Sequence, residues 1–460
     1  MVATSFDKVS PLTGEVLASY PRSSKNEAID AIASARVAFS EWKKTTIESR
    51  GRMIRQTAIL LGQRQHELAE LVRQETGKPM ADSLGEIGGA IEMGFMLSAY
   101  GRFPMGKLLP SAIPLRHTRL QRVPLGVAAL IVTYNAPIPN FAWKIFPALM
   151  AGNTVVVKPS PHTPASADAF VAILHEAGIP TDVLRVIHGD GEAAAGLIEG
   201  GADLVSFTGS YPTGVKVMGA AAATLAKTVI ELGGSNPLIV CADANVAHAA
   251  TTAIDSAFSN AGQRCASASR VVVDDAVLAT FLDHVFEGAA QLSVGTDPDA
   301  RIGTLIDASS AEAYEDFLEQ CVASGATVTR WGSVKGESSC LVLPAVVTGL
   351  DPRSELGLRE VFGPVMRVCG FATEDQAIEM ANATEFGLTA AVWSQDLVRA
   401  ERIVAGVQAG VININGPTHG AEINFPFGGV KHSGNGSRDA GVEAIDAYSD
   451  VQVVSTFLGA

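Results

Sequence analysis

The chain is poor in cysteine, in aromatic residues and in charged residues. Its 460 residues include five cysteines (Cys241, Cys265, Cys321, Cys340 and Cys369), and charged residues make up only 18%. An odd and widely scattered set of cysteines fits neither a disulfide framework nor a metal-binding spacing such as C-x-x-C. Because apolar residues make up 47%, we expect a globular protein with well-buried cores, reduced thiols and no metal site.

Three further features are missing: a membrane-spanning apolar run, a leader pattern and a surplus of basic residues. The longest apolar run, VPLGVAALIV from Val123, is far shorter than the roughly 18 residues that cross a bilayer. The N-terminal MVATSFDKVS lacks the basic-then-apolar order of a signal peptide. A net charge of -14 argues against a nucleic-acid partner, which requires a basic face. We therefore expect a soluble cytoplasmic protein with no membrane or nucleic-acid partner.

The hydrophobic pattern divides the chain into a helical part and two α/β parts, consistent with a length that exceeds one core. From about Asn26 to Tyr100, apolar residues recur at three- and four-residue spacing, which predicts helices. From Gly126, short Val/Ile/Leu runs that end in turn residues predict strands buried on both faces of a parallel sheet: VAALIVT, NTVVVKPS, VLRVIHG, ADLVSFTGS and KTVIELGG. From about Asn245 a second set follows: SRVVVDD, TVTRW, MRVCGF, AAVWS and GVININ. Residues 106–122 alternate weakly, which indicates an exposed hairpin or arm.

The segment NAGQRCASASR sets Cys265 directly behind Arg264 among small residues. A core cysteine usually lies among Leu, Ile, Val and Phe, where it behaves as a small hydrophobe. These neighbours are too small to enclose the thiol. Cys265 is therefore either an inert thiol on a small-residue helix or a nucleophile held open to a substrate.

Two glycine-rich turns and a lysine suggest a nucleotide site in the first α/β part. GDGEAAAG has the wrong last spacing for a dinucleotide fingerprint. FTGSYPTG follows a strand and precedes a helix, so Gly209, Ser210 and Gly214 could receive a pyrophosphate at the helix N-terminus. Lys158 stands at a strand end, where it could bind ribose hydroxyls. The alternatives are a simple β–α turn with a Ser cap and a solvated lysine.

Two polar residues at strand ends complete a possible active site. Glu231, between Ile and Leu before two glycines, is poorly solvated, which should raise its pKa toward that of a useful base. Asn135 follows a strand in a Pro-rich turn and could donate to an oxyanion. Alternatively, Glu231 reaches water and Asn135 forms an Asx turn.

Together, these motifs resemble the NAD(P)-dependent aldehyde dehydrogenase family over essentially the whole chain. The matching segments, in family order, are PLTGEVLASYP, AWKIFPALMAGNTVVVKPSPHTP, FTGSYPTG, VIELGGSNP, NAGQRCASASR, REVFGPV and FPFGGVKHSGNG. The resemblance implies a Rossmann-like NAD(P)-binding domain (residues 1–105 and 123–240), an α/β catalytic domain (241–445) and a small β oligomerisation arm (106–122 and 446–460). It also implies a homodimer or homotetramer.

The resemblance assigns roles by position. Cys265 looks like the catalytic nucleophile. Asn135 and the Cys265 backbone N–H would form the oxyanion hole. Glu231 would be the general base, and Lys144 resembles the family's lysine linked to proton transfer. For NAD or NADP, it implies that Gly209, Ser210 and Gly214 face the pyrophosphate, Lys158 the adenosine ribose, and Glu360 and Phe362 the nicotinamide ribose and ring.

The implied reaction converts an aldehyde to a carboxylic acid. The thiolate forms a hemithioacetal, a hydride leaves for the nicotinamide, and water activated by Glu231 hydrolyses the thioester. The alternatives are a CoA-acylating dehydrogenase, whose members generally lack the acid at Glu231, and a cysteine hydrolase without a dinucleotide, for which REVFGPV would have no purpose.

Three positions depart from the family pattern. Pro161 replaces an acid that would bind the ribose diol and repel a 2′-phosphate, which weakens a strict preference for NAD. Tyr211 stands in the phosphate turn, with unknown effect. At the position where some members have a second acid, this chain has Val442. Glu443 follows it, and we assign Glu443 no role.

The substrate is the least determined part. AGQRC recurs in family members that act on aldehydes with a second, anionic end, so Arg264 could bind such a carboxylate bidentately. Asn140, Trp143 and Phe425 would line the same entrance and also suit aromatic or aliphatic aldehydes. The alternative for Arg264 is an ordinary ion pair with a neighbouring acid. A semialdehyde is therefore one candidate substrate and a simple aldehyde the other.

Overall fold

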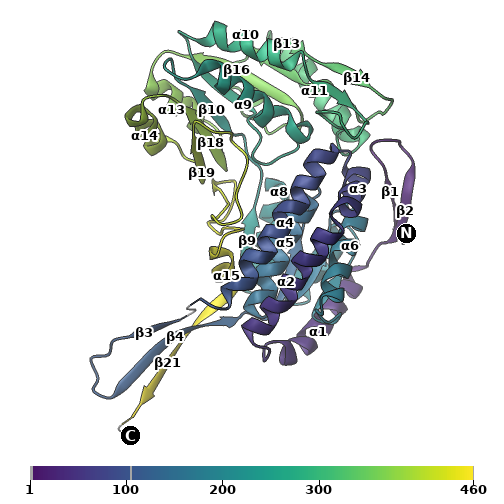
Figure 1. Ribbon diagram of the computed structural model, residues 1–460, viewed down its shortest axis with the longest axis vertical. Coiled ribbons are helices and arrows are strands. Elements are labelled where there is room, and N and C mark those ends of the chain that lie inside the picture. The colour runs from purple at the N-terminus through teal and green to yellow at the C-terminus, as the bar shows by residue number, and fades with distance from the viewer. Residues whose placement is uncertain (1–3, 104–105, 459–460) are drawn as a thin grey trace.

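The computed structural model describes residues 4–103 and 106–458 and confirms an α/β fold with two lobes and a projecting arm (Figure 1). The predicted ranges 1–105 and 446–460 thus include a few residues outside this set. The helical region begins with α1, whose N-cap Ser24 and Glu27 form a capping box. The helices here are α1 (Lys25–Trp42), α2 (Ile47–Gln63), α3 (Gln65–Thr76) and α4 (Met80–Tyr100), as the periodicity predicted.

The first lobe holds a five-stranded parallel sheet in the order β7-β6-β5-β8-β9. Its strands are β5 (Val127–Ile131), β6 (Thr154–Lys158), β7 (Leu184–Val186), β8 (Leu204–Thr208) and β9 (Lys227–Glu231). The connecting helices are α5 (Pro137–Ala151), α6 (Pro164–Glu176), α7 (Gly191–Glu199) and α8 (Tyr211–Ala222). The strand order reverses between β5 and β8, which is where open α/β sheets bind ligands.

The second lobe holds a seven-stranded sheet in the order β13-β15-β16-β11-β10-β18-β19, parallel except for β13. Its strands are β10 (Pro237–Val240), β11 (Arg270–Asp274), β13 (Thr327–Arg330), β15 (Ala345–Thr348), β16 (Val365–Phe371), β18 (Thr389–Trp393) and β19 (Val411–Ile414). Its longer helices are α9 (Val246–Phe258), α10 (Leu278–Ala289), α11 (Ala308–Ala323), α13 (Glu374–Asn382) and α14 (Leu397–Gly406).

Both ends of the predicted catalytic range, residues 241–445, need correction. Strand β10 pairs with β11 and β18, so the second sheet begins at Pro237, before the predicted boundary. At the other end, Ile445 packs with Ile423 and Tyr448 in the hydrophobic core of the first lobe. The chain therefore returns to the first lobe earlier than predicted.

The arm is a three-stranded sheet in the order β21-β4-β3, as residues 106–122 and the C-terminal segment together predicted. It consists of β3 (Lys107–Leu109), β4 (Arg116–Pro124) and β21 (Ser449–Phe457), all antiparallel, and it projects from the body at the lower left of Figure 1. The remaining elements, which the sequence analysis left unassigned, are β1 (Ser5–Val9), β2 (Val16–Pro21), η1 (Ser259–Gly262), β12 (Ser293–Gly295), β14 (Ser333–Lys335), α12 (Glu355–Leu358), β17 (Phe386–Gly387), β20 (Val430–Lys431) and α15 (Glu443–Ala447).

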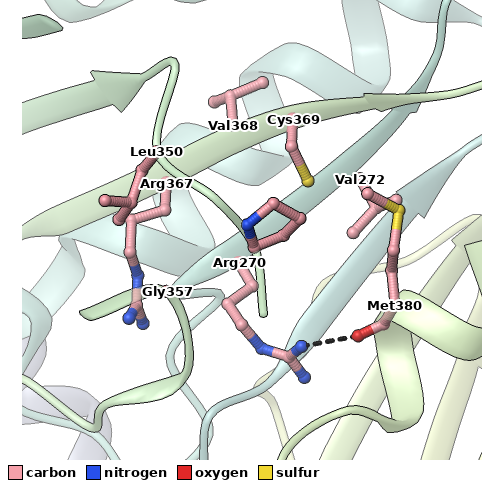
Figure 2. Close-up of a pocket in the computed structure, with 9 residues that line it drawn as sticks. Arg270, Val272, Leu350, Gly357, Arg367, Val368, Cys369 and Met380 are labelled. Carbon is pink, nitrogen blue, oxygen red and sulfur yellow. Dashed lines mark hydrogen bonds between the residues drawn. The ribbon is translucent and has the colours of Figure 1, made fainter. Parts of the chain in front are cut away.

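A buried arginine in the second lobe holds the chain that leads from β9 to β10. The Arg270 guanidinium donates to the backbone oxygens of Ser235, Met380 and Ala381 at 2.7–2.9 Å. The cavity beside it has a volume of about 20 Å³, and Figure 2 shows Arg270 and Cys369 among the residues that line it. Such a space holds about one water molecule, so we assign it a structural role.

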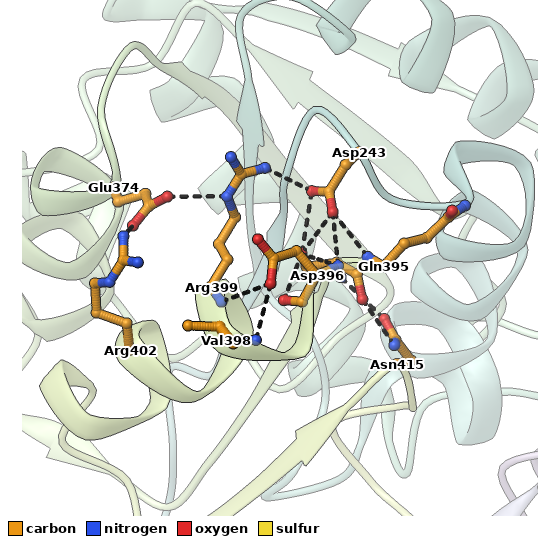
Figure 3. A network of polar contacts seen from close by, with 9 residues as sticks. Asp243, Glu374, Gln395, Asp396, Val398, Arg399, Arg402 and Asn415 are labelled. Atoms are coloured by element: carbon orange, nitrogen blue, oxygen red, sulfur yellow. Dashed lines mark hydrogen bonds and ion pairs between the residues drawn. The ribbon is translucent and has the colours of Figure 1, made fainter.

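A second polar cluster ties α14 to the ends of β10 and β18. Arg399 lies between Asp243 at 2.8 Å and Glu374 at 2.9 Å, and Asp243 also accepts hydrogen bonds from Ser394 and Asp396 (Figure 3). Asp396 in turn caps α14. Among the helices that the structure describes, none is long and apolar enough to cross a membrane.

Candidate active site

A cavity of about 560 Å³ lies where the two lobes meet. Its first-lobe wall comes from the carboxyl ends of β5, β8 and β9, which contribute Asn135, Gly209 and Glu231. The second lobe contributes Cys265 and Glu360. The structure therefore brings the predicted nucleophile, base and oxyanion donor into one space at the topological switch point.

Cys265 lies in a loop rather than on a small-residue helix. Within the short turn η1, which precedes Cys265, the residues Asn260, Ala261 and Gly262 have left-handed φ values of 53°, 52° and 69°. A Cβ at Gly262 would approach the oxygen of Gly363 to 2.1 Å, so only glycine fits there. Asn236 Nδ2 donates to the Cys265 backbone oxygen at 2.7 Å. This strained, hydrogen-bonded loop holds the thiol at the cavity wall.

Glu231 raises the pKa of the Cys265 thiol, whereas the contact with Cys265 lowers the pKa of Glu231. Burial is the largest effect on both: it raises the pKa of Glu231 to about 8 and the pKa of the Cys265 thiol well above its usual value. The charge of Asp439 raises the pKa of Glu231 further, whereas Lys144 opposes that shift. Glu231 Oε1 is buried and has no hydrogen-bond partner among the described residues. Glu231 is therefore a carboxylate able to accept a proton near neutral pH.

Asp439 is one of the acids that the sequence analysis missed. It lines the cavity, whereas Glu443 is exposed and does not. Its Oδ2 accepts a hydrogen bond from the fully buried Lys144 Nζ at 2.7 Å, and it reaches the site through an isolated antiparallel bridge to Phe427. Lys144 itself is not in the cavity lining, but its hydrogen bond to Asp439 connects it to a residue that is. A bridge between distant loops leaves no spacing signal in the sequence.

Asn135 has a side chain that is available to a ligand. Its backbone oxygen accepts hydrogen bonds from Lys78 Nζ at 2.8 Å and Asn260 Nδ2 at 3.1 Å, which fix the turn. Its side-chain amide lines the cavity and makes no hydrogen bond to another described residue. An Asx turn would use that amide's oxygen, so the geometry favours the oxyanion donor.

The end of the cavity at β8 has the donor groups that a dinucleotide phosphate needs. Gly209 and Ser210 line it, and Ser210 is the N-cap of α8 without a side-chain capping bond, so the first N–H groups stay free. The buried Thr208 Oγ1 has no partner within the described residues. Gly214, in contrast, faces away. A Cβ there would meet the Leu232 side chain at 2.5 Å, so its role is helix–strand packing.

Glu360 and Phe362 lie opposite this turn. The Glu360 carboxylate accepts a hydrogen bond from the Gly234 N–H at 2.9 Å, and burial raises its pKa to about 7. A Cβ at Gly233 would come within 2.1–2.4 Å of that carboxylate, so glycine makes room for it. Phe362 packs edge-on against Tyr134. A helix N-terminus, a free hydroxyl and a carboxylate in one cleft fit a pyrophosphate and a ribose.

Lys158 and Tyr211 lie outside the cavity lining. Lys158 Nζ donates to the backbone oxygens of Pro159 at 2.8 Å and Gly189 at 3.0 Å, and burial lowers its pKa to about 8. Tyr211 stacks on His432, with ring centroids 4.2 Å apart. These two contacts use two of the three donors of the Lys158 ammonium and leave one for a ligand.

The opposite end of the cavity is lined by charged and aromatic side chains. Arg264 lies 3.6 Å from Asp82 and donates to His419 Nδ1 at 3.3 Å. Trp143 packs on Phe427, with ring centroids 5.6 Å apart. Phe425 is not in the lining; Phe427, two residues later, occupies the predicted place.

The sequence analysis missed the acids at this end. Asp82 and Glu86 come from α4, and Glu86 pairs with the buried Lys78. Asn140 lines the cavity, but its Nδ2 donates to the Ala136 oxygen at 2.8 Å. Helical spacing predicted α4 correctly, but it gave no reason to place Asp82 and Glu86 in the same site as Cys265, which is distant from them in the sequence.

Comparisons with known proteins identify the family and the fold of this chain. The sequence model described as "Aldehyde dehydrogenase family" matches residues 2–454. An α-ketoglutarate semialdehyde dehydrogenase of Haloferax volcanii is 36% identical over 442 residues, covering 95% of this chain and 92% of the relative. The fold matches the betaine aldehyde dehydrogenase of Staphylococcus aureus in complex with NAD+ (30% identity, 99% and 92% coverage, TM-score 0.95). It matches an NAD-dependent aldehyde dehydrogenase of Sinorhizobium meliloti equally well (33% identity, 99% and 92% coverage, TM-score 0.95).

Proposed function

This chain belongs to the aldehyde dehydrogenase family, and we propose that it oxidises its aldehyde to a carboxylic acid through a thioester on Cys265. The observation that carries this proposal is the shared cavity of Cys265, Glu231 and Asn135. The enzyme is NAD(P)-dependent, as the family and the NAD+ complexes of its structural relatives show.

Each residue has a defined task in the proposed reaction. Cys265 reacts as the thiolate, after its proton has passed to solvent: the sulfur bonds to the aldehyde carbon, and the aldehyde oxygen becomes an oxyanion. Asn135 Nδ2 and the Cys265 N–H donate hydrogen bonds to that oxyanion. When bound, NAD+ or NADP+ supplies the hydride acceptor, held by Gly209, Ser210 and Glu360.

Hydrolysis then depends on Glu231. Once its proton has left, the carboxylate takes a proton from water as the water oxygen attacks the thioester carbonyl. The carbon–sulfur bond breaks, the carboxylic acid leaves and the thiol is regenerated. The Lys144–Asp439 pair stands directly behind this base and tunes its basicity.

The experiment is to measure NAD(P)H absorbance with each cofactor and a panel of aldehydes, with and without CoA. We expect reduced cofactor and free acid without CoA. Turnover that requires CoA would indicate a CoA-acylating enzyme. Cleavage of activated esters without any cofactor reduction would indicate a cysteine hydrolase.

For the substrate, we favour a semialdehyde, a molecule with an aldehyde at one end and a carboxylate at the other. Arg264 has unused guanidinium donors at the cavity, since its partners are one hydrogen bond and one 3.6 Å ion pair. A relative named for a semialdehyde supports this choice. The second candidate is an aromatic or aliphatic aldehyde, which Trp143 and Phe427 favour.

We also propose a homodimer or homotetramer in the cytoplasm. The arm exposes large apolar side chains: Leu108, Leu115, Val453, Phe457 and Leu458. Exposed apolar patches of this kind mark association surfaces. Light scattering would give the mass, and a monomeric protein would contradict the assembly.

The cytoplasmic location is supported by the cysteines. All five are unpaired, which fits a reducing compartment.

A further inference from the structure

A chain of buried side chains runs from the active site to the root of the arm. Tyr448 OH donates to Ser206 Oγ at 2.9 Å, and Lys144 Nζ donates to the same Ser206 Oγ at 3.0 Å. Lys144 Nζ also donates to Asp439 Oδ2 at 2.7 Å, and Asp439 lines the cavity together with Glu231. Tyr448, Ser206 and Lys144 are 0% exposed, so this connection is shielded from solvent.

The two hydroxyls occupy positions where apolar side chains would pack without penalty. Ser206 lies in the middle of β8, whose residues are all buried, and Tyr448 belongs to the apolar core of the first lobe. A buried hydroxyl is retained at a cost unless it satisfies another polar group. Here the group in need is the Lys144 ammonium, a buried cation with several donors to place.

The position of Tyr448 is tied to the arm. Its backbone oxygen accepts a hydrogen bond from Asn153 Nδ2 at 2.7 Å. The Asn153 Oδ1 accepts from the N–H groups of Leu125 at 2.8 Å and Gly126 at 3.0 Å, directly after β4. Tyr448 itself directly precedes β21. One asparagine thus joins the inner ends of both long arm strands to the residue that supports Ser206.

We propose that Tyr448 and Ser206 are positioning residues for the general base: they hold the Lys144 ammonium against Asp439 and thereby set the charge that faces Glu231. The proposal rests on the proposed function, since it assigns them a part in the hydrolytic step. It also implies that Lys144 is placed correctly only when the arm is packed correctly against the first lobe.

The expected effect has a definite sign. The charged or titratable groups that act on Glu231 are Asp439, Lys144, Cys265 and Glu360. A less firmly held Lys144 would oppose the Asp439 charge less, so the pKa of Glu231 would rise further. The acidic limb of the steady-state pH profile should then move to higher pH.

The test compares Tyr448→Phe and Ser206→Ala with wild type in two assays, the pre-steady-state burst of NAD(P)H and the pH profile of steady-state turnover. We expect an unchanged burst amplitude and a midpoint raised by roughly 0.5 to 1 pH unit, equal to a threefold to tenfold loss well below the midpoint. Ser256→Ala is the matched control, because Ser256 is equally buried but its hydroxyl has no partner among the described residues.

The outcomes separate the two proposals. A wild type that forms no NAD(P)H with any aldehyde would count against the proposed reaction itself. A normal burst with wild-type midpoints in both variants would overturn the positioning role, as would an equal shift in Ser256→Ala. If Tyr448→Phe does not fold, as judged by its thermal unfolding, Ser206→Ala decides alone, since it leaves the tyrosine ring in the core.

Discussion

The two ends of the cavity are built in different ways. The end proposed for the cofactor uses backbone N–H groups and glycines at the ends of neighbouring strands, Thr208–Ser210 and Glu231–Gly233. The end proposed for the aldehyde uses side chains from separate elements: Asp82 on α4, Trp143 on α5, Arg264, His419 and Phe427. A site made of backbone groups suits a ligand that all members of a family bind. A site made of side chains can change its substrate, because those side chains can be substituted without disturbing the sheets.

The centre of the cavity, between these ends, should matter for every aldehyde. Changes to Cys265 or Glu231 should therefore lower turnover whatever the substrate, whereas changes to Arg264 or Asp82 should alter the choice between substrates. Each prediction below tests that division.

Cys265→Ser should show the largest effect. Turnover should fall by at least about 10³-fold on all aldehydes, because a serine hydroxyl is a weak nucleophile without further activation. Thermal stability should hardly change. Cys369→Ser is the matched control, since Cys369 is also half-buried but lies beside Arg270, outside the cavity. Comparable losses in both variants would remove Cys265 from its role.

Glu231→Gln should separate the two half-reactions. We expect a burst of NAD(P)H near one per active site, followed by steady-state turnover slowed by about 10²–10⁴-fold, because only hydrolysis requires the base throughout. Stopped-flow absorbance gives both quantities. The exposed Glu443→Gln should behave as wild type. Loss of the burst would show that proton transfer from Cys265 to Glu231 is needed earlier.

The pH profile should follow the buried carboxyl. Hydrolysis needs ionised Glu231, whose pKa is raised to about 8, so turnover should rise with pH, about tenfold per unit below pH 8, and level off above it. Glu231→Gln should lose this dependence. A profile that is flat between pH 6 and 8 in wild type would place the limiting step elsewhere.

Arg264→Ala should change selectivity. The loss of a charged hydrogen bond, about 1.5–3 kcal/mol, should lower kcat/KM for succinic semialdehyde by roughly 10- to 150-fold and leave butanal nearly unchanged. Equal losses on both aldehydes, or none on either, would rule out an anion-binding role and favour the simple aldehydes.

Asp82→Asn should have the smallest effect, with the opposite sign. Asp82 lies 3.6 Å from the guanidinium of Arg264 and competes with a substrate carboxylate for it. Removing that charge should raise the preference for succinic semialdehyde over butanal by a few-fold, on the order of 1 kcal/mol or less for a partly exposed pair. A lowered preference would mean that Asp82 orients Arg264 instead.

The difference between the two ends also explains what the sequence could predict. The helices of residues 26–100, the strands of the first sheet and most strands of the second follow from hydrophobic periodicity, although β10 and β15 were not predicted. The strand-end residues Asn135 and Glu231 follow from the predicted strands. The loop at Cys265 could not be predicted, because its consecutive left-handed residues include Asn260 and Ala261, which give no such signal. Asp439 and Phe427 reach the site through an isolated antiparallel bridge to each other, which periodicity does not record.

The most direct test of the account is to trap the covalent intermediate. Glu231→Gln is mixed with NAD+ and an aldehyde that gives a burst, quenched in acid and digested, and the peptides are analysed by mass spectrometry. We predict the acyl mass on the peptide that contains Cys265 and on none of the peptides with Cys241, Cys321, Cys340 or Cys369. A burst with no acyl adduct, or with the adduct on another cysteine, would contradict the thioester mechanism.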